Sequence, residues 1–487
     1  MSKITIDPIT RLEGHGRIDL FLDEQGALEN AYLIIPELRG FEKFCEGRPV
    51  EEMAQLTQRI CGVCPIAHHM AAAKAGDAVY HVEPPPTARK LRELMYNAFF
   101  VADHATHFFA LGGPDFVVGP DAPKSERNLL GVVRKVGREI GARAIQLLQD
   151  NHEICAIVGG RYIHSVGAII GGVSKPITEE ERRQIVERAR RSIETAQFSL
   201  QLFDQVVLQN KGYVDLILSE AFTHRTYYMG LVDEQNRVNF YDGLVRVVGP
   251  DGKELVKYSP AQYLDVIAEH IEPWTYLKFP YLKQVGWKGL VDGPESGVYR
   301  ATPLSRLNAA DGMATPLAQA EYERFYATLG GKPVHHTLAT HWARLIELLY
   351  AAERVLELAE DPEITGTDIR TIPTAIPDEG IGIVEAPRGT LTHHYITDER
   401  GLLKQVNLIV GTTNNYAAIS MSIKKAAAGL IRPGKPVSDG VLNTIEMAFR
   451  AYDPCFGCAT HALPGQTPMV VRVYNHAREL VQEIRRG

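Results

Sequence analysis

The sequence lacks several features that define whole classes of protein. Its longest apolar stretches, such as Val166–Val173, fall far short of the ~20 residues that cross a bilayer, so we expect no membrane partner. It holds 52 basic against 59 acidic side chains, with a net charge of −7 and no clustered basic stripe. We therefore expect no nucleic-acid partner. The first residues form neither an apolar leader nor a twin-arginine signal, which predicts a cytoplasmic location.

Cysteine is also scarce, with six residues in 487. Four of them form two C-x-x-C pairs, Cys61/Cys64 and Cys455/Cys458, and this usage indicates metal or redox chemistry rather than a disulfide framework. The other two, Cys45 and Cys155, have no partner at ligand spacing and are interpreted as small core thiols.

The composition and periodicity predict a large folded chain of the α+β class, a mainly helical body with β elements at its edges. Hydrophobic content is 45% and charged content 23%, both close to globular averages. Alternating apolar residues predict a small β-meander over 1–36, and a region rich in Gly, Pro, Tyr and Asp over about 230–335 predicts an insertion of strands and loops. Helical spacing recurs at 91–110, from about 180, at 338–358 and at 438–453.

Four thiolates are the ligand set of structural zinc, of iron-sulfur clusters and of soft transition metals, and the spacing inside each pair does not choose among them. The spacing between the pairs is more informative. A zinc ribbon closes a short local loop, whereas 455 minus 64, or 391 positions, separates these pairs. Composition favours one metal site, which needs the whole fold, over two unrelated redox or core pairs.

The surroundings of the pairs resemble a known family. "RICGVCPIAHH" at 59–69 and "DPCFGCATH" at 453–461 resemble the paired signature of nickel-iron hydrogenase large subunits. Supporting motifs spread this resemblance over most of the chain: "RLEGH" at 11–15, "RGFE" at 39–42, "DHATHFF" at 103–109 and "APRG" at 386–389. The resemblance implies a catalytic body over 1–461 with the fold of such subunits, and an activity that splits or makes hydrogen.

The resemblance also implies how the cysteines are used. Cys61 and Cys455 would be terminal nickel thiolates, while Cys64 and Cys458 would bridge nickel to an iron that carries cyanide and carbon monoxide. Soft thiolates suit nickel. The thiolate of Cys455 would take a proton from hydrogen, and Glu13, which matches the family's proton-relay glutamate, would carry it toward solvent. Without the cysteine motifs, Glu13 would be interpreted as part of a surface ion pair.

Arg388 would place a guanidinium above the open position of the metal centre, with Asp103 and Asp453 as its carboxylate partners and Pro387 beside it. Because an arginine pKa lies above ~12, we favour orientation and electrostatics for Arg388 over a role as the base.

Four further positions match the family near the metals. Glu42 and His461, with the backbone carbonyl of Leu408, match a magnesium site. Thr412 matches a position that hydrogen-bonds a diatomic ligand on iron, and this alignment crosses a gap. His68 is expected to hydrogen-bond a cysteine sulfur and so tune the thiolate site. His104 and His107, by contrast, are interpreted as structural core histidines.

The rest of the resemblance concerns partners and processing. In the family, an extension comparable to residues 462–487 is removed by a maturation endopeptidase after nickel enters, although "MVVRVYN" also alternates as an ordinary strand. Electrons would leave through an iron-sulfur small subunit, then through further electron-transfer subunits to a nicotinamide, flavin or heterodisulfide-reductase acceptor, as in the soluble cytoplasmic groups. The alternatives are a metal-free subunit like those of respiratory complex I, or a zinc-stabilised scaffold.

Overall fold

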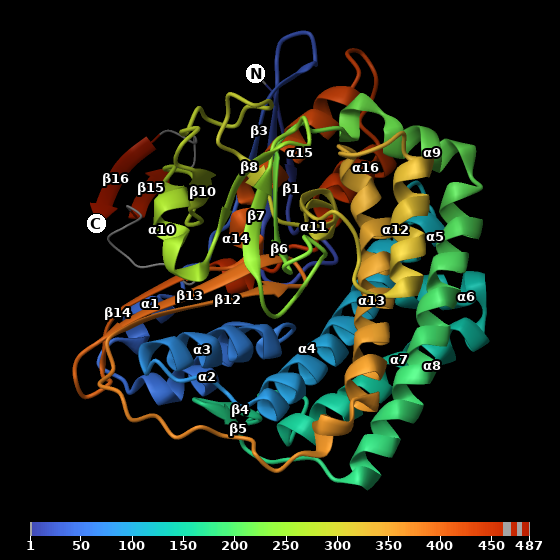
Figure 1. The fold of residues 1–487 in the computed structure, drawn as a ribbon. Helices are drawn as coiled ribbons and strands as arrows, with labels where there is room; N and C mark the ends of the chain where they lie inside the picture. Colours follow the sequence, from blue (N-terminus) through green and yellow to red (C-terminus); the bar gives the residue numbers. More distant parts are fainter. Residues whose placement is uncertain (1, 461–468, 475–479, 487) are drawn as a thin grey trace.

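A computed structural model describes residues 2–460, 469–474 and 480–486. The chain forms a helical body with several small sheets, which confirms the predicted α+β class (Figure 1). The predicted N-terminal meander is present as an antiparallel sheet in the order β1 (Ser2–Ile6), β2 (Arg17–Leu22) and β3 (Leu28–Ile34). The Asp23 carboxylate accepts from the Gln25 and Ala27 amides at 2.9 Å each, and these bonds close the turn between β2 and β3.

Five long helices build the body: α3 (Pro65–Val79), α4 (Pro86–Thr106), α7 (Arg138–Gly159), α8 (Glu179–Phe203) and α13 (Thr340–Glu360). Helix α8 begins at the capping box that the sequence predicts, between Thr178 and Glu181. Helix α13 packs against both α4 and α8, which explains why most of its residues are buried. The predicted helices at 91–110, 180 and 338–358 are thus confirmed within a few residues.

Shorter helices fill the spaces between these elements. They are α1 (Phe41–Cys45), α2 (Met53–Leu56), α5 (Gly113–Val117), α6 (Leu129–Val136), α9 (Lys211–Leu218), α10 (Tyr263–Val266), α14 (Gly411–Asn414), α15 (Tyr416–Leu430), α16 (Asp439–Arg450) and α17 (Phe456–Ala459). Helix α16 is the helix predicted at 438–453, and it ends before Asp453, whose φ of 53° turns the chain toward Cys455.

The region about 230–335 contains strands for only part of its length. The strands are β6 (Tyr227–Val232), β7 (Leu244–Val248), β8 (Glu254–Tyr258), β9 (Ile267–His270), β10 (Phe279–Leu282) and β11 (Tyr299–Arg300). Beyond them the chain forms helices α11 (Pro303–Ala309) and α12 (Pro316–Thr328), where strands and loops were expected. Both helices begin with proline at their first position, where its missing N–H and fixed φ favour a helix start rather than a loop.

An antiparallel sheet of β12 (Glu379–Ala386), β13 (Gly389–Thr397) and β14 (Leu403–Ile409) lies within the body (Figure 1). The sequence analysis did not identify it. Strand β12 packs directly on α3, because a Cβ at Gly380 would lie 2.3 Å from the Val79 nitrogen and one at Gly382 would lie 2.4 Å from the Ala75 nitrogen. These glycines therefore bring the sheet against the helix that begins at the first cysteine pair.

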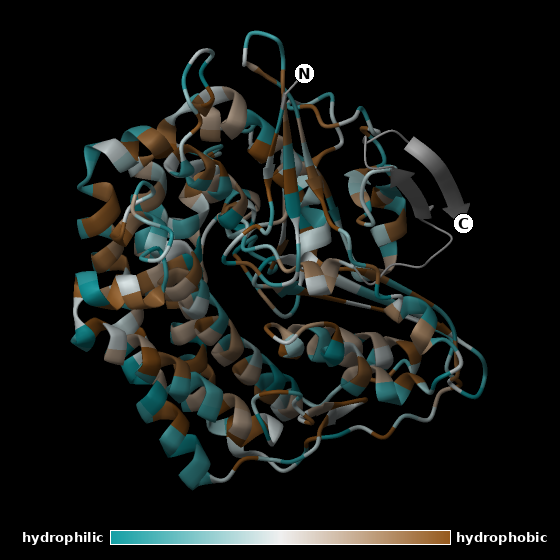
Figure 2. Ribbon diagram, turned by 180° about the vertical axis from the view of Figure 1, so that it is seen from behind, coloured by the Kyte–Doolittle hydropathy of each residue, from teal (hydrophilic) through white to brown (hydrophobic). Residues whose placement is uncertain are grey.

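Polar and apolar residues alternate along the long helices in the reverse view (Figure 2). No helix within the described ranges is both long and apolar enough to cross a membrane. Two short strands, β4 (Ala168–Ile169) and β5 (Gly172–Val173), pair antiparallel, and β15 (Met469–Tyr474) pairs with β16 (Leu480–Arg486) in the same way. The strand predicted within "MVVRVYN" is therefore present.

Candidate metal centre

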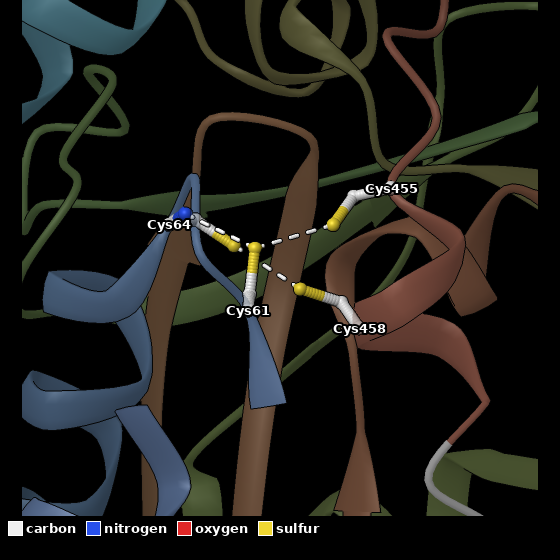
Figure 3. A group of neighbouring side chains, drawn as sticks. All are labelled: Cys61, Cys64, Cys455 and Cys458. Carbon is white, nitrogen blue, oxygen red and sulfur yellow. Dashed lines mark hydrogen bonds between the residues drawn. The ribbon is translucent and has the colours of Figure 1, made fainter. Parts of the chain in front are cut away.

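The two cysteine pairs meet in the interior of the protein (Figure 3). All four sulfur atoms lie within 4.8 Å of one another and are buried. The Sγ atoms of Cys61 and Cys455 are 3.3 Å apart, and those of Cys64 and Cys458 are 3.2 Å apart. The structure thus brings together the pairs that 391 positions of sequence separate, as the single-site prediction requires.

Each pair uses the start of a helix to aim its sulfurs. Cys64 is the N-cap of α3, and the amides of Val63 and Cys64 donate to the Cys61 sulfur at 3.2 and 3.1 Å. Cys455 is the N-cap of α17, and Cys458 lies within that helix. Backbone amides at a helix start favour negative charge, so both loops suit thiolates.

Arg39 fastens the two loops together, a role that the sequence analysis did not assign. Its guanidinium donates to the carbonyl of Ile60, just before the first pair, and at 2.8 Å to the carbonyl of Gly457, inside the second pair. The position of Arg39 in "RGFE" was the available signal, because a planar fork with five donors can bind two backbone segments at once.

The sulfur cluster fits a soft metal better than it fits four free thiols. Burial raises the pKa of the Cys455 and Cys458 thiols well above the usual range, because no water stabilises their anions. A metal cation would offset that penalty and hold the sulfurs as thiolates. Four convergent cysteines are a donor set for nickel, iron or zinc.

Glu13 contacts the cluster directly. Its Oε2 atom lies 3.0 Å from the Cys455 sulfur and accepts from the Gly457 amide at 2.8 Å. The backbones also pair, because the Phe456 amide donates to the Glu13 carbonyl at 2.9 Å. Thr412 supports the same loop from α14, where its Oγ1 accepts from the Cys455 amide at 3.0 Å. A proton on the Cys455 sulfur therefore has a carboxylate within reach.

Arg388 lies at the tip of the β12–β13 hairpin, with Pro387 before it. Its Nη1 donates to Asp103 Oδ2 at 3.0 Å, and its Nη2 lies 2.9 Å from Asp453 Oδ2. Burial would lower the pKa of Arg388, but the two carboxylates outweigh it and hold that pKa well above its usual range. The guanidinium therefore remains a fixed positive charge.

Arg388 shares an enclosed cavity of about 10 Å³, roughly the space of one water molecule, with the cluster. Its other walls include Cys64, Cys455, Cys458 and His68. A group in this cavity would meet both the sulfurs and the guanidinium.

The remaining predicted residues lie farther from the sulfurs or contact other groups. His68 Nδ1 is 3.1 Å from the Nε2 of His393, a partner that the sequence analysis missed. Glu42 Oε1 accepts from the Leu408 amide at 2.9 Å, so two of the three predicted magnesium residues are neighbours. The third, His461, falls outside the described residues.

The buried histidines and the two remaining cysteines have partners away from the sulfurs. His104 Nε2 lies 2.9 Å from Glu347 and His107 Nε2 lies 3.0 Å from the Arg450 carbonyl. Burial lowers the pKa of both rings, so they are neutral at pH 7. Cys45 and Cys155 are buried in the hydrophobic core.

Comparison with known families decides what kind of metal site this is. The family model described as nickel-dependent hydrogenase matches residues 39–129 and 232–461, and a model described as HoxL-like matches residues 3–38. The chain belongs to the nickel-dependent hydrogenase family. It is an oxidoreductase and the catalytic large subunit of a hydrogenase, which decides against both a zinc-stabilised scaffold and a metal-free subunit.

Full-length relatives and a solved structure of this hydrogenase family agree. The chain is 47% identical over 485 residues to the iron-sulfur subunit of an F420-non-reducing hydrogenase of Archaeoglobus profundus, with 100% of each chain covered. It is 37% identical over 495 residues to NAD-reducing hydrogenase HoxS subunit beta of Cupriavidus necator, with 99% of each covered. Its fold matches a crystal structure of NAD+-reducing [NiFe]-hydrogenase in the H2-reduced state with a TM-score of 0.89 and 36% identity, covering 95% of this chain and 100% of the other.

Proposed function

We propose that this hydrogenase subunit holds a binuclear nickel-iron centre and catalyses the reversible heterolytic cleavage of hydrogen into two protons and two electrons. Cys61 and Cys455 would be terminal ligands of nickel, and Cys64 and Cys458 would bridge nickel and iron. The observation that carries the proposal is the group of four buried sulfurs within 4.8 Å, with the Glu13 carboxylate 3.0 Å from one of them. When bound, the metal centre supplies Lewis-acid and redox chemistry that accepts the electrons.

The chain's own groups handle the protons. The Cys455 sulfur accepts one proton from hydrogen, and Glu13 takes it from the sulfur and passes it toward solvent. Arg388 orients and stabilises charge above the sulfurs, because its raised pKa keeps it protonated. Asp103 and Asp453 fix the direction of that guanidinium, and Pro387 shapes the same side of the cavity.

Three further assignments extend the site. Thr412 would hydrogen-bond a cyanide or carbon monoxide ligand on iron, and its hydroxyl already contacts the Cys455 amide. His68 would tune a cysteine sulfur from the cavity wall. Glu42, the Leu408 carbonyl and His461 would bind Mg²⁺, since carboxylate and carbonyl oxygens suit this cation.

The chain needs a partner to release its electrons. Six cysteines minus the four of the cluster leave two, too few for the four thiolates of an ordinary iron-sulfur cluster. We therefore infer an iron-sulfur small subunit, with further electron-transfer subunits, in a soluble cytoplasmic complex. The names of the relatives favour a nicotinamide, flavin or heterodisulfide acceptor over F420. Residues 462–487 would be removed by a maturation endopeptidase.

Hydrogen–deuterium exchange tests the proposal in the complex purified with its natural partners. The wild-type complex should form HD and H₂ from D₂ in ordinary water, and Cys61→Ser should abolish this exchange because a hard hydroxyl replaces a soft thiolate. Cys45→Ser is the matched control, since Cys45 is also buried but lies outside the cluster, and it should retain exchange. Exchange that survives Cys61→Ser would refute the assigned site.

A further inference from the structure

The turn that presents Arg388 is anchored by a second arginine. The loop of the β12–β13 hairpin consists only of Pro387 and Arg388, because Ala386 and Gly389 are the last paired residues. Arg306, on α11, donates to the backbone carbonyls of Ala386 at 2.9 Å and Pro387 at 3.2 Å. The backbone just before Arg388 is therefore tied to a helix outside the sheet.

Arg306 is itself held by carboxylates. Its Nε and Nη2 each donate to Glu347 at 2.6 Å, and its Nη1 donates to Glu385 at 3.0 Å. Together with the two carbonyls, these contacts use all five N–H groups of the guanidinium. All three side chains have an exposed fraction of 0%. The fork has one satisfied orientation, and Glu347 fixes two of its arms.

A second connection runs from Glu347 to the same turn. Glu347 Oε2 lies 2.9 Å from His104 Nε2, and His104 Nδ1 lies 3.3 Å from Arg344 Nη1. That Nη1 atom is also 3.5 Å from the Pro387 carbonyl and 3.5 Å from Asp453 Oδ2. Glu347 thus connects through His104 and Arg344 both to the hairpin tip and to a carboxylate that pairs with Arg388.

These contacts matter because Arg388 is not fully fixed by its own partners. Its Nε atom is buried and has no hydrogen-bond partner among the described residues. Buried ion pairs also contribute little net stability, since apolar residues of similar volume often serve as well or better. A group of buried charges that converges on one two-residue turn is therefore better explained by positioning than by stability.

We propose that Arg306, Glu347, His104 and Arg344 are positioning residues that set the direction of Arg388 toward the sulfur cluster. This inference rests on the proposed function, in which Arg388 acts above the metals. A misplacement of about 1 Å can reduce a rate about 100-fold without contact between the altered residue and the substrate. Weakening the Glu347 node should therefore impair turnover while the cysteines keep their metals.

The test compares Glu347→Gln with Asp77→Asn in the assembled enzyme. Asp77 pairs with Arg92, which also holds two backbone carbonyls, so the control removes the same kind of buried charge. It lies 13 residues along α3 from Cys64, or about 20 Å at the helical rise. Nickel content, iron content and thermal midpoint report structure, whereas kcat, the KM for hydrogen and the nickel electron paramagnetic resonance spectrum report Arg388.

We expect Glu347→Gln to keep its nickel and iron, to lower kcat about 10- to 100-fold with KM for hydrogen within about twofold, and to shift the nickel spectrum. Asp77→Asn should leave kcat and the spectrum unchanged. An unchanged kcat and spectrum in Glu347→Gln would overturn the inference. If that variant does not assemble, Arg344→Lys decides in the same way, because lysine keeps the charge but loses the fork.

The wild-type enzyme separates this inference from the proposed function. A wild-type complex without nickel or hydrogen turnover would refute the proposed function. A competent wild-type complex together with an unaffected Glu347→Gln would refute only the positioning role.

Discussion

A single added methyl at Gly457 should disconnect Glu13 from the sulfur cluster. An ideal Cβ at this position would lie 2.5 Å from Glu13 Oε1 and 2.8 Å from Oε2. Carbon and oxygen approach to about 3.3 Å, so the carboxylate must move by roughly 0.8 Å or more. Such a shift breaks the 3.0 Å contact with the Cys455 sulfur and the 2.8 Å bond from the Gly457 amide.

The expected result of Gly457→Ala is a kcat for hydrogen oxidation about 10²- to 10⁴-fold lower, which is the usual contribution of a positioned acid–base group. Dye-coupled hydrogen oxidation by the assembled enzyme measures it, with nickel and iron content checked in parallel. Gly62→Ala is the matched control in the other cysteine loop, because an added Cβ there meets nothing within 4 Å in this subunit.

A double-mutant cycle makes the interpretation stricter. If Gly457→Ala acts by displacing Glu13, then adding Glu13→Gln should slow the enzyme little further. Normal turnover in Gly457→Ala, or losses that multiply in the double variant, would contradict the role given to Glu13.

Three further substitutions test the surroundings of the site. Thr412→Val leaves the buried Cys455 amide unpaired and should destabilise the protein by about 1–3 kcal/mol, while Thr413→Val should be near neutral because the Thr413 hydroxyl has no partner among the described residues; thermal unfolding compares the two. Burial raises the pKa of Glu385 from 4.5 to about 7, so its ionisation opposes folding, and the stability of wild type relative to Glu385→Gln should fall as pH rises from about 4.5 to 7, by up to about 3 kcal/mol. A flat difference between pH 5 and 8 would contradict that pKa. Asp115→Asn removes the carboxylate from two buried guanidinium groups and should cost about 3–5 kcal/mol, and an unchanged unfolding midpoint would count against it.

The sequence predicted the long helices and the meander because their signals are local. Helical spacing identified α4 and α13, and the capping box identified the start of α8. The β12–β14 sheet has no such signal. Its strands are buried on both faces, so they lack the polar–apolar alternation of a half-exposed strand.

The same difference separates the parts of the site. Residues in dense motifs, such as the cysteines and Glu13, could be named from the sequence and do meet in the structure. Arg306 and Glu347 could not, because each is a lone charge on an otherwise apolar helix. Only the fold shows that they share a buried site with Pro387.

Elemental analysis of the wild-type complex purified with its natural partners tests the central claim most directly. Nickel, iron and zinc should be measured together, since all three metals accept cysteine ligands. The account predicts nickel with at least an equal amount of iron, and loss of nickel when Cys61 is changed to Ser. Zinc alone in the active wild-type complex would contradict it.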